Sequence, residues 1–148
     1  MRNSRWRVCV AAVVVACAGP TGPDAGLPYV YALASCGPAD GPAVTLTFSG
    51  TPYSGERVSP PYVLMTVYRP PTDLAGRTYT FDRTGDTASG VMIDASGAYV
   101  GAVTGTLQVD RVTGDNSVVA YVNAQLPDGS RLRRAFVAPW RIALVACG

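Results

Sequence analysis

Apolar and polar residues alternate one by one along much of this 148-residue chain. Val44, Leu46 and Phe48 are separated by threonines, and Tyr79 and Phe81 follow the same period. A period of two places successive side chains on opposite faces of a strand, one face buried and the other in water. Beyond the N-terminal segment, no window of about twelve residues carries the stripe of an amphipathic helix.

Further alternating runs toward the C-terminus predict a three-stranded meander over Gly105 to Val112, Val118 to Leu126 and Arg131 to Val137. Asp128-Gly129 separates the last two runs, and both of its residues tolerate the positive φ of a type I′ hairpin turn. We expect a last strand from Trp140 to Ala146.

The segment from Tyr62 to Tyr68 differs, because it is apolar on both faces and is bounded by Pro-Pro pairs. Its β-branched and aromatic residues are typical of a central strand. Turn signals recur about every ten residues, so the sequence predicts an all-β fold of about eight or nine strands. Both an antiparallel β-sandwich and a small β-barrel fit, because each buries alternate residues.

The N-terminal residues follow another pattern. Three arginines precede an apolar run from Val8 to Ala16, which has the length of a signal sequence and about half of the roughly 20 residues that a spanning helix needs. Glycine, proline and small residues then dominate up to Pro28 and indicate a flexible tether. We expect a signal peptide at 1–16, Cys17 with a tether at 17–28, and a single β domain at 29–148.

The apolar run ends in Val14-Val15-Ala16-Cys17, which resembles the lipobox of bacterial lipoproteins. The resemblance implies that the leader is removed before Cys17, that a diacylglycerol is attached to the Cys17 thiol, and that this lipid makes the membrane a partner. Cleavage by an ordinary signal peptidase after Ala18 stays open, because Ala16-Cys17-Ala18 also fits the small-x-small rule.

The C-terminal half is similar to small bacterial lipoproteins of β-rich fold. The similarity lies in the Gly105-x-Leu107-x-Val109 strand, the Leu126-Pro-Asp128-Gly129 turn and Phe136-x-Ala138 before a terminal cysteine. Together the two resemblances imply a lipid-anchored protein of the bacterial envelope, at the outer membrane or cell surface. Cleavage after Ala18 would instead make the protein secreted or periplasmic.

Removal of the leader changes the charge. The 12 basic residues are all arginines and face 10 acids; three arginines precede Cys17, which leaves 9 − 10 = −1. A near-neutral domain gives no support for a nucleic-acid partner, which needs clustered positive charge. The absence of histidine and of a G-x-S-x-G motif, and the single glutamate, Glu56, argue against an enzyme and against a histidine zinc site. We expect no cofactor.

Two of the four cysteines, Cys9 and Cys17, belong to the leader or its end. In an oxidising compartment this leaves Cys36 and Cys147 as one available pair, and we predict a disulfide between them. Two buried free thiols are the alternative.

Arg131, Arg133 and Arg134 form the densest charge cluster. On a strand Arg131 and Arg133 share a face and could grip a phosphate or carboxylate, although a solvated strand face that protects an edge explains them better. Arg134 has the parity of buried residues, which predicts either a bulge or an arginine with a buried stem.

Two further groups of residues are candidates for ligand binding. Asp82, Asp86 and Asp94 could hold calcium, but turn formation explains them more simply and we expect no metal site. Tyrosines and one tryptophan could form a glycan or apolar-ligand surface, although we expect most of them in or around the core. These aromatic residues are Tyr53, Tyr62, Tyr68, Tyr99 and Trp140.

Two functions therefore remain. The first is a non-catalytic envelope protein that acts by contact with an envelope protein partner or as a structural component; the second is a β domain that binds a small apolar or glycan ligand. A closed barrel with an enclosed pocket would favour the second function. A filled core with an exposed apolar patch would favour the first.

Overall fold

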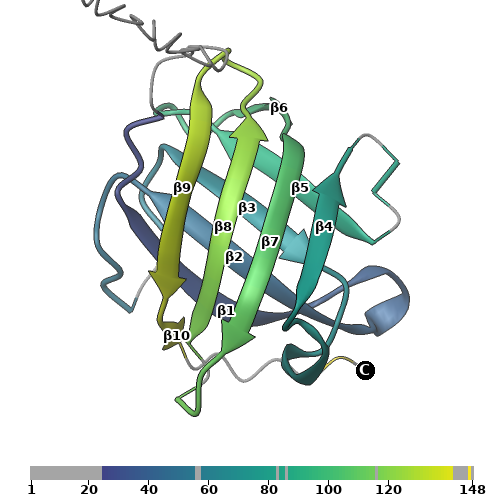
Figure 1. Cartoon of the computed structure of the whole chain (residues 1–148). Helices are drawn as coiled ribbons and strands as arrows, with labels where there is room; N and C mark the ends of the chain where they lie inside the picture. Colours follow the sequence, from purple (N-terminus) through teal and green to yellow (C-terminus); the bar gives the residue numbers. More distant parts are fainter. Residues whose placement is uncertain are drawn as a thin grey trace, which may run out of the picture.

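The chain forms two stacked β-sheets in the computed structural model, which describes residues 25–55, 58–82, 84–85, 87–115, 117–141 and 147 (Figure 1). The six-stranded sheet has the order β10-β1-β2-β3-β5-β6, and the four-stranded sheet has the order β4-β7-β8-β9. The strands of the first sheet are β1 (Tyr29–Cys36), β2 (Pro42–Ser49), β3 (Tyr62–Val67), β5 (Ala88–Ile93), β6 (Tyr99–Ala102) and β10 (Trp140–Arg141). Those of the second are β4 (Arg77–Phe81), β7 (Thr104–Val112), β8 (Val118–Gln125) and β9 (Arg131–Ala138).

The predicted all-β fold is confirmed, and the sandwich is the form it takes. The two sheets remain separate, so the fold is not a closed barrel. All strand pairs are antiparallel except β1 with β10, which run parallel. The short edge strands β6 and β10 bring the number of strands among the described residues to ten.

Two strands change sheets at the corners of the sandwich. β6 continues through buried Val103 into β7, and β9 continues through Pro139 into β10. The Val103 amide donates to the carbonyl of Gly90, and the Ala32 amide donates to that of Pro139. A Cβ on Gly90 would lie 2.8 Å from the Cβ of Val103, so glycine is needed where this corner approaches β5.

The core lies between the sheets and is filled. Alternate residues of both sheets meet there, including Phe48, Met65, Leu107 and Leu132, all with less than 1% of their surface exposed. A gap lined by Val44 and neighbouring aliphatic side chains is too narrow to admit a water molecule. The interior therefore offers no ligand cavity at this gap.

The meander β7-β8-β9 forms as predicted, but its second turn differs from the expected type I′ hairpin. The Gly129 amide donates to the Leu126 carbonyl, so Pro127 and Asp128 are the central residues of that turn. Only Gly129 has a positive φ, of 87°. Proline fixes φ near −65°, which suits the first central position of a type I turn, and the following glycine completes a three-residue connection.

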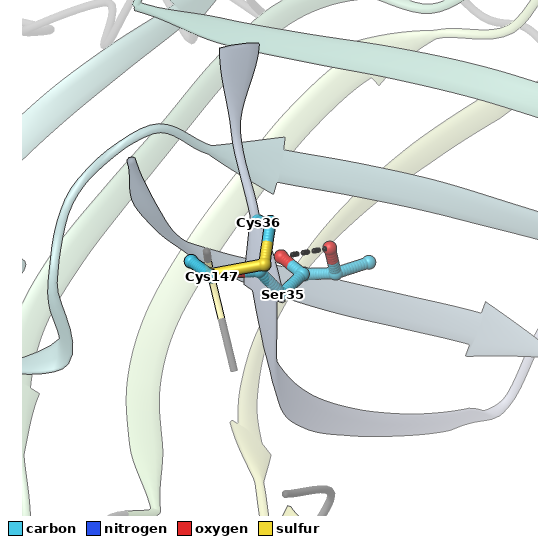
Figure 2. The surroundings of a disulfide bond; sticks show 4 residues. Ser35, Cys36 and Cys147 are labelled. Carbon is cyan, nitrogen blue, oxygen red and sulfur yellow. Dashed lines mark hydrogen bonds between the residues drawn. A yellow bond between two sulfur atoms is a disulfide. The ribbon is translucent and has the colours of Figure 1, made fainter. Parts of the chain in front are cut away.

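A disulfide joins Cys36, the last residue of β1, to Cys147, as the sequence predicted (Figure 2). The Cα atoms lie 5.6 Å apart, a normal separation for this bond. It ties Cys147 to the end of β1 beside Ser35.

Part of the predicted tether packs on the domain. Leu27 is buried in the core cluster, and the Ala25 amide donates to the carbonyl of Arg131. The signal peptide, Cys17 and the rest of the tether lie outside the described residues. Among the residues that are described, no helix has the length and apolarity to cross a membrane.

Candidate contact site

The five strands β1, β2, β3, β5 and β6 carry no charged residue. Their inner side chains form half of the core, so the absence of charge is expected there. Their outer side chains face away from the four-stranded sheet. The outer face of an antiparallel sheet is usually polar and often carries charged residues. The outer face of these five strands is therefore uncharged, and we call it the neutral face. It is bordered by Arg141 of the edge strand β10, which is paired with outward-facing Leu33.

The strand register places its side chains in rows. One row runs across Tyr29, Ser49, Tyr62, Ile93 and Tyr99. The next two rows are aligned in the same way, because residues two positions apart lie on one face. They consist of Tyr31, Thr47, Leu64, Val91 and Ala102, and of Leu33, Thr45, Thr66 and Ser89.

Hydroxyl groups are linked to one another across these rows. The Thr45 hydroxyl donates to the Ser35 hydroxyl oxygen at 2.8 Å, and its oxygen lies 2.9 Å from that of Thr66. The Tyr68 hydroxyl donates to Ser89 at 2.6 Å. Each hydroxyl can donate one hydrogen bond and accept others, so the linked groups keep capacity for a ligand.

Two hollows open on the neutral face. The first, of about 250 Å³, is lined by Tyr31, Ser49, Thr51, Pro52, Tyr53, Ser54, Val58 and Ser59. The second, of about 370 Å³, is lined by Leu33, Ala34, Ser35, Thr45, Thr47, Val58, Tyr62 and Leu64. Val58 borders both, so the two hollows are neighbours.

The connection from β2 to β3 forms the wall of the first hollow. The Tyr53 ring packs against the Tyr31 ring with their centroids 4.8 Å apart, and the Arg141 guanidinium lies 5.2 Å from the Tyr53 centroid. This stack covers Tyr31, and its burial raises the pKa of the Tyr31 phenol. Tyr31 therefore stays neutral throughout the physiological pH range.

Most tyrosines gather on this face, and two of the eight, Tyr31 and Tyr79, are buried. Six of the eight lie on it or pack on it: Tyr29, Tyr31, Tyr53, Tyr62, Tyr68 and Tyr99. Tyr99 is 64% exposed and Tyr29 is 43% exposed. Of the predicted aromatic candidates, the structure brings Tyr53 and Tyr62 to the hollows, while Trp140 packs against the core.

The outer face of the four-stranded sheet is different in character. Its rows carry threonine, glutamine and asparagine together with arginines of β9. A hollow of about 260 Å³ on that face is bordered by Asp110 and Tyr121. The described part of the sandwich thus has one neutral face and one polar, charged face.

The predicted arginine cluster is divided between two sides of β9. Arg131 and Arg133 share the outer face, and the Nε of Arg133 donates to the Tyr121 hydroxyl at 2.8 Å. Arg134 points inward; it donates to the Leu27 carbonyl and lies 5.7 Å from the Phe48 ring centroid. The register of β8 with β9 is continuous. The predicted bulge is therefore wrong, and the alternative prediction, an arginine with a buried stem, is confirmed. Arg134 thus holds the N-terminal segment on the domain.

The predicted aspartates serve turns. The Asp82 carboxylate accepts hydrogen bonds from Thr84 and Gly85, and that of Asp94 from Ser96 and Ala98. The hydrogen bonds lower the pKa of both carboxyl groups. Asp86 lies outside the described residues, and no group of three metal-ligating side chains occurs among those that are described.

The linked hydroxyls of Ser35, Thr45 and Thr66, and the aliphatic Leu33 and Leu64 beside them, were not recognised from sequence. Each resembles an ordinary exposed strand position when it is viewed alone. The available signal was the absence of charge from all five strands that form the face.

The fold is a β-sandwich in which two open hollows lie on the neutral face. No family model, curated protein or solved structure matches the chain. The assignment of a function therefore rests on the geometry of the face.

Proposed function

We propose that this protein is a non-catalytic component of the bacterial envelope, anchored through a lipid on Cys17, which acts by contact through its neutral face. One observation carries the contact function: aromatic, aliphatic and hydroxyl side chains form a face free of charge beside two open hollows. An exposed surface of this kind is typical of an interaction site. The gap in the core is too narrow to admit a ligand, so we place the contact on the surface.

The anchor rests on the resemblance of Val14 to Cys17 to a lipobox. Cys17→Ser removes the thiol that would carry the lipid. We expect the variant to move from the membrane fraction to the soluble fraction and to lose labelling by a fatty-acid analogue. A variant that is still processed and membrane-bound would refute the anchor.

The contact function is tested by photo-crosslinking in intact envelopes. A photoreactive phenylalanine is placed at Tyr62, on the neutral face, or at Tyr121, on the opposite outer face, as the matched control. We expect adducts with envelope components from position 62 and few from position 121. Equal adduct yields from the two positions would show that the neutral face is not the contact surface.

A further inference from the structure

We infer that the neutral face binds an uncharged glycan chain, which lies across the two hollows on either side of Val58. This inference rests on the proposed function, because it identifies the chemical class of the contacted partner. Three properties support it: the absence of charge from the described residues that line the hollows, the supply of hydroxyl groups, and the position of aromatic rings beside the hollows.

The absence of charge excludes the strongest interactions with ionic ligands. The described residues that line both hollows carry no carboxylate or guanidinium. Arg141 lies at the edge, and its guanidinium is stacked on the Tyr53 ring. Phosphate and carboxylate ligands gain most of their affinity from arginine or lysine, so an acidic ligand would lose that contribution here. A neutral ligand avoids the cost of burying an unpaired charge.

The hydroxyl groups match the polar groups of a sugar. In the first hollow, six of the eight lining residues carry a hydroxyl: Tyr31, Ser49, Thr51, Tyr53, Ser54 and Ser59. The second hollow contains the linked pair Ser35 and Thr45. A sugar hydroxyl both donates and accepts, as serine and threonine do, so hydrogen bonds can form in either direction. A ligand that can only accept hydrogen bonds would use these hydroxyl groups as donors but not as acceptors.

The shape of the face suits a chain of rings better than a flat protein surface. The hollows have volumes of about 250 and 370 Å³, just below and just inside the range for small-ligand pockets. Two such hollows that share Val58 offer consecutive positions to a linear ligand. Tyr53 borders one hollow and Tyr62 the other, and the flat apolar face of an aromatic ring packs well on the C–H face of a sugar.

The test uses the purified protein and neutral hexasaccharides of glucose, xylose, mannose and N-acetylglucosamine, with a hexasaccharide of galacturonic acid as the charged comparison. Backbone amide NMR reports both binding and its location. We expect at least one neutral hexasaccharide to shift amides of β1, β2, β3 and residues 50–55 and 58–59. The charged hexasaccharide should leave these amides unchanged.

Substitutions then assign the binding to individual side chains. Tyr62→Ala should weaken saccharide binding about tenfold through lost ring packing. Thr45→Val keeps the shape of the side chain but removes its hydroxyl, and should weaken binding about fivefold. Tyr121→Ala is the matched control, because that ring lies on the opposite outer face, and it should leave the affinity unchanged. Thr45→Val keeps the test decisive if Tyr62→Ala does not fold.

The outcomes separate this inference from the proposed contact function. If no neutral hexasaccharide shifts the face at millimolar concentration, or if the shifts map to β7, β8 and β9, the glycan inference is overturned. Retention of full affinity in both Tyr62→Ala and Thr45→Val overturns it as well. If position 62 nevertheless crosslinks to an envelope protein, the contact function stands without the glycan. If crosslinking also fails, both are wrong.

Discussion

The disulfide between Cys36 and Cys147 should contribute a large part of the stability of the sandwich. It closes a loop with a sequence separation of 111 residues. In the chain-entropy model, a loop of this length restricts the unfolded chain by an entropy that corresponds to about 4.8 kcal/mol at 25 °C. Native domains have a total stability of about 5–15 kcal/mol, so the bond accounts for a third of it or more.

The paired substitution Cys36→Ser and Cys147→Ser removes the bond without leaving a free thiol. Urea unfolding of this variant and the wild type, followed by circular dichroism, gives the difference in the free energy of unfolding. With a denaturant slope of about 1.5 kcal/mol/M, the expected loss moves the midpoint down by about 3 M. Such a shift is easily measured unless the variant is already unfolded in buffer.

Reductant supplies the control for this measurement. The wild type in dithiothreitol should fall to the stability of the double variant, and the variant should not respond to dithiothreitol. A double variant within about 1 kcal/mol of the oxidised wild type would refute the entropy argument, since the predicted loss is several times larger.

Three other changes test the fold. Leu107→Ala, in the core, should lower the free energy of unfolding by about 2–5 kcal/mol in urea titrations, whereas Val137→Ala, 57% exposed, should change it by less than about 0.5 kcal/mol. Gly105→Ala should cost at least about 2 kcal/mol in the same assay, because φ is 136° and a Cβ would lie 2.3 Å from the Asn123 carbonyl oxygen; Gly114→Ala, with open space, should be nearly neutral. Hydrogen bonds lower the pKa of Asp94, so its stabilisation is present above the ordinary value of 3.8 and is lost as pH falls through the lowered folded-state pKa. In Asp94→Asn, Tm measured by calorimetry should therefore fall less steeply as the pH is lowered. An unchanged dependence of Tm on pH would contradict this.

The strands were predictable because alternation is a local property. Val44, Leu46 and Phe48 are buried on the inner face of β2, as their period indicated. The pairing of strands was not predictable in the same way. β1 lies beside β10, which is more than 100 residues later in the chain, and no local pattern encodes such a contact.

The neutral face was not recognised from the sequence, because alternation divides the residues of a strand between two faces without showing which face is buried. In β3, Val63 and Met65 point to the core while Tyr62 and Leu64 point outward, yet all four are apolar or aromatic. The usual distinction by charge is absent there. For this reason the pattern did not show that Tyr62 and Leu64 point outward. The register of neighbouring strands supplied the missing information, because it aligns Tyr62 with Ile93 and Tyr99 on the outer side.

The disulfide and the neutral face meet on β1, the neighbour of β10. Among the described residues, β10 shares two residue pairs with β1, Ala32 with Trp140 and Leu33 with Arg141. Arg141 stacks on Tyr53, which walls the first hollow. The disulfide joins Cys147 to the last residue of β1, Cys36. The same strand carries Tyr31, whose ring packs on Tyr53 beside the first hollow. A loss of order in β1 would therefore affect both the disulfide and the wall of this hollow.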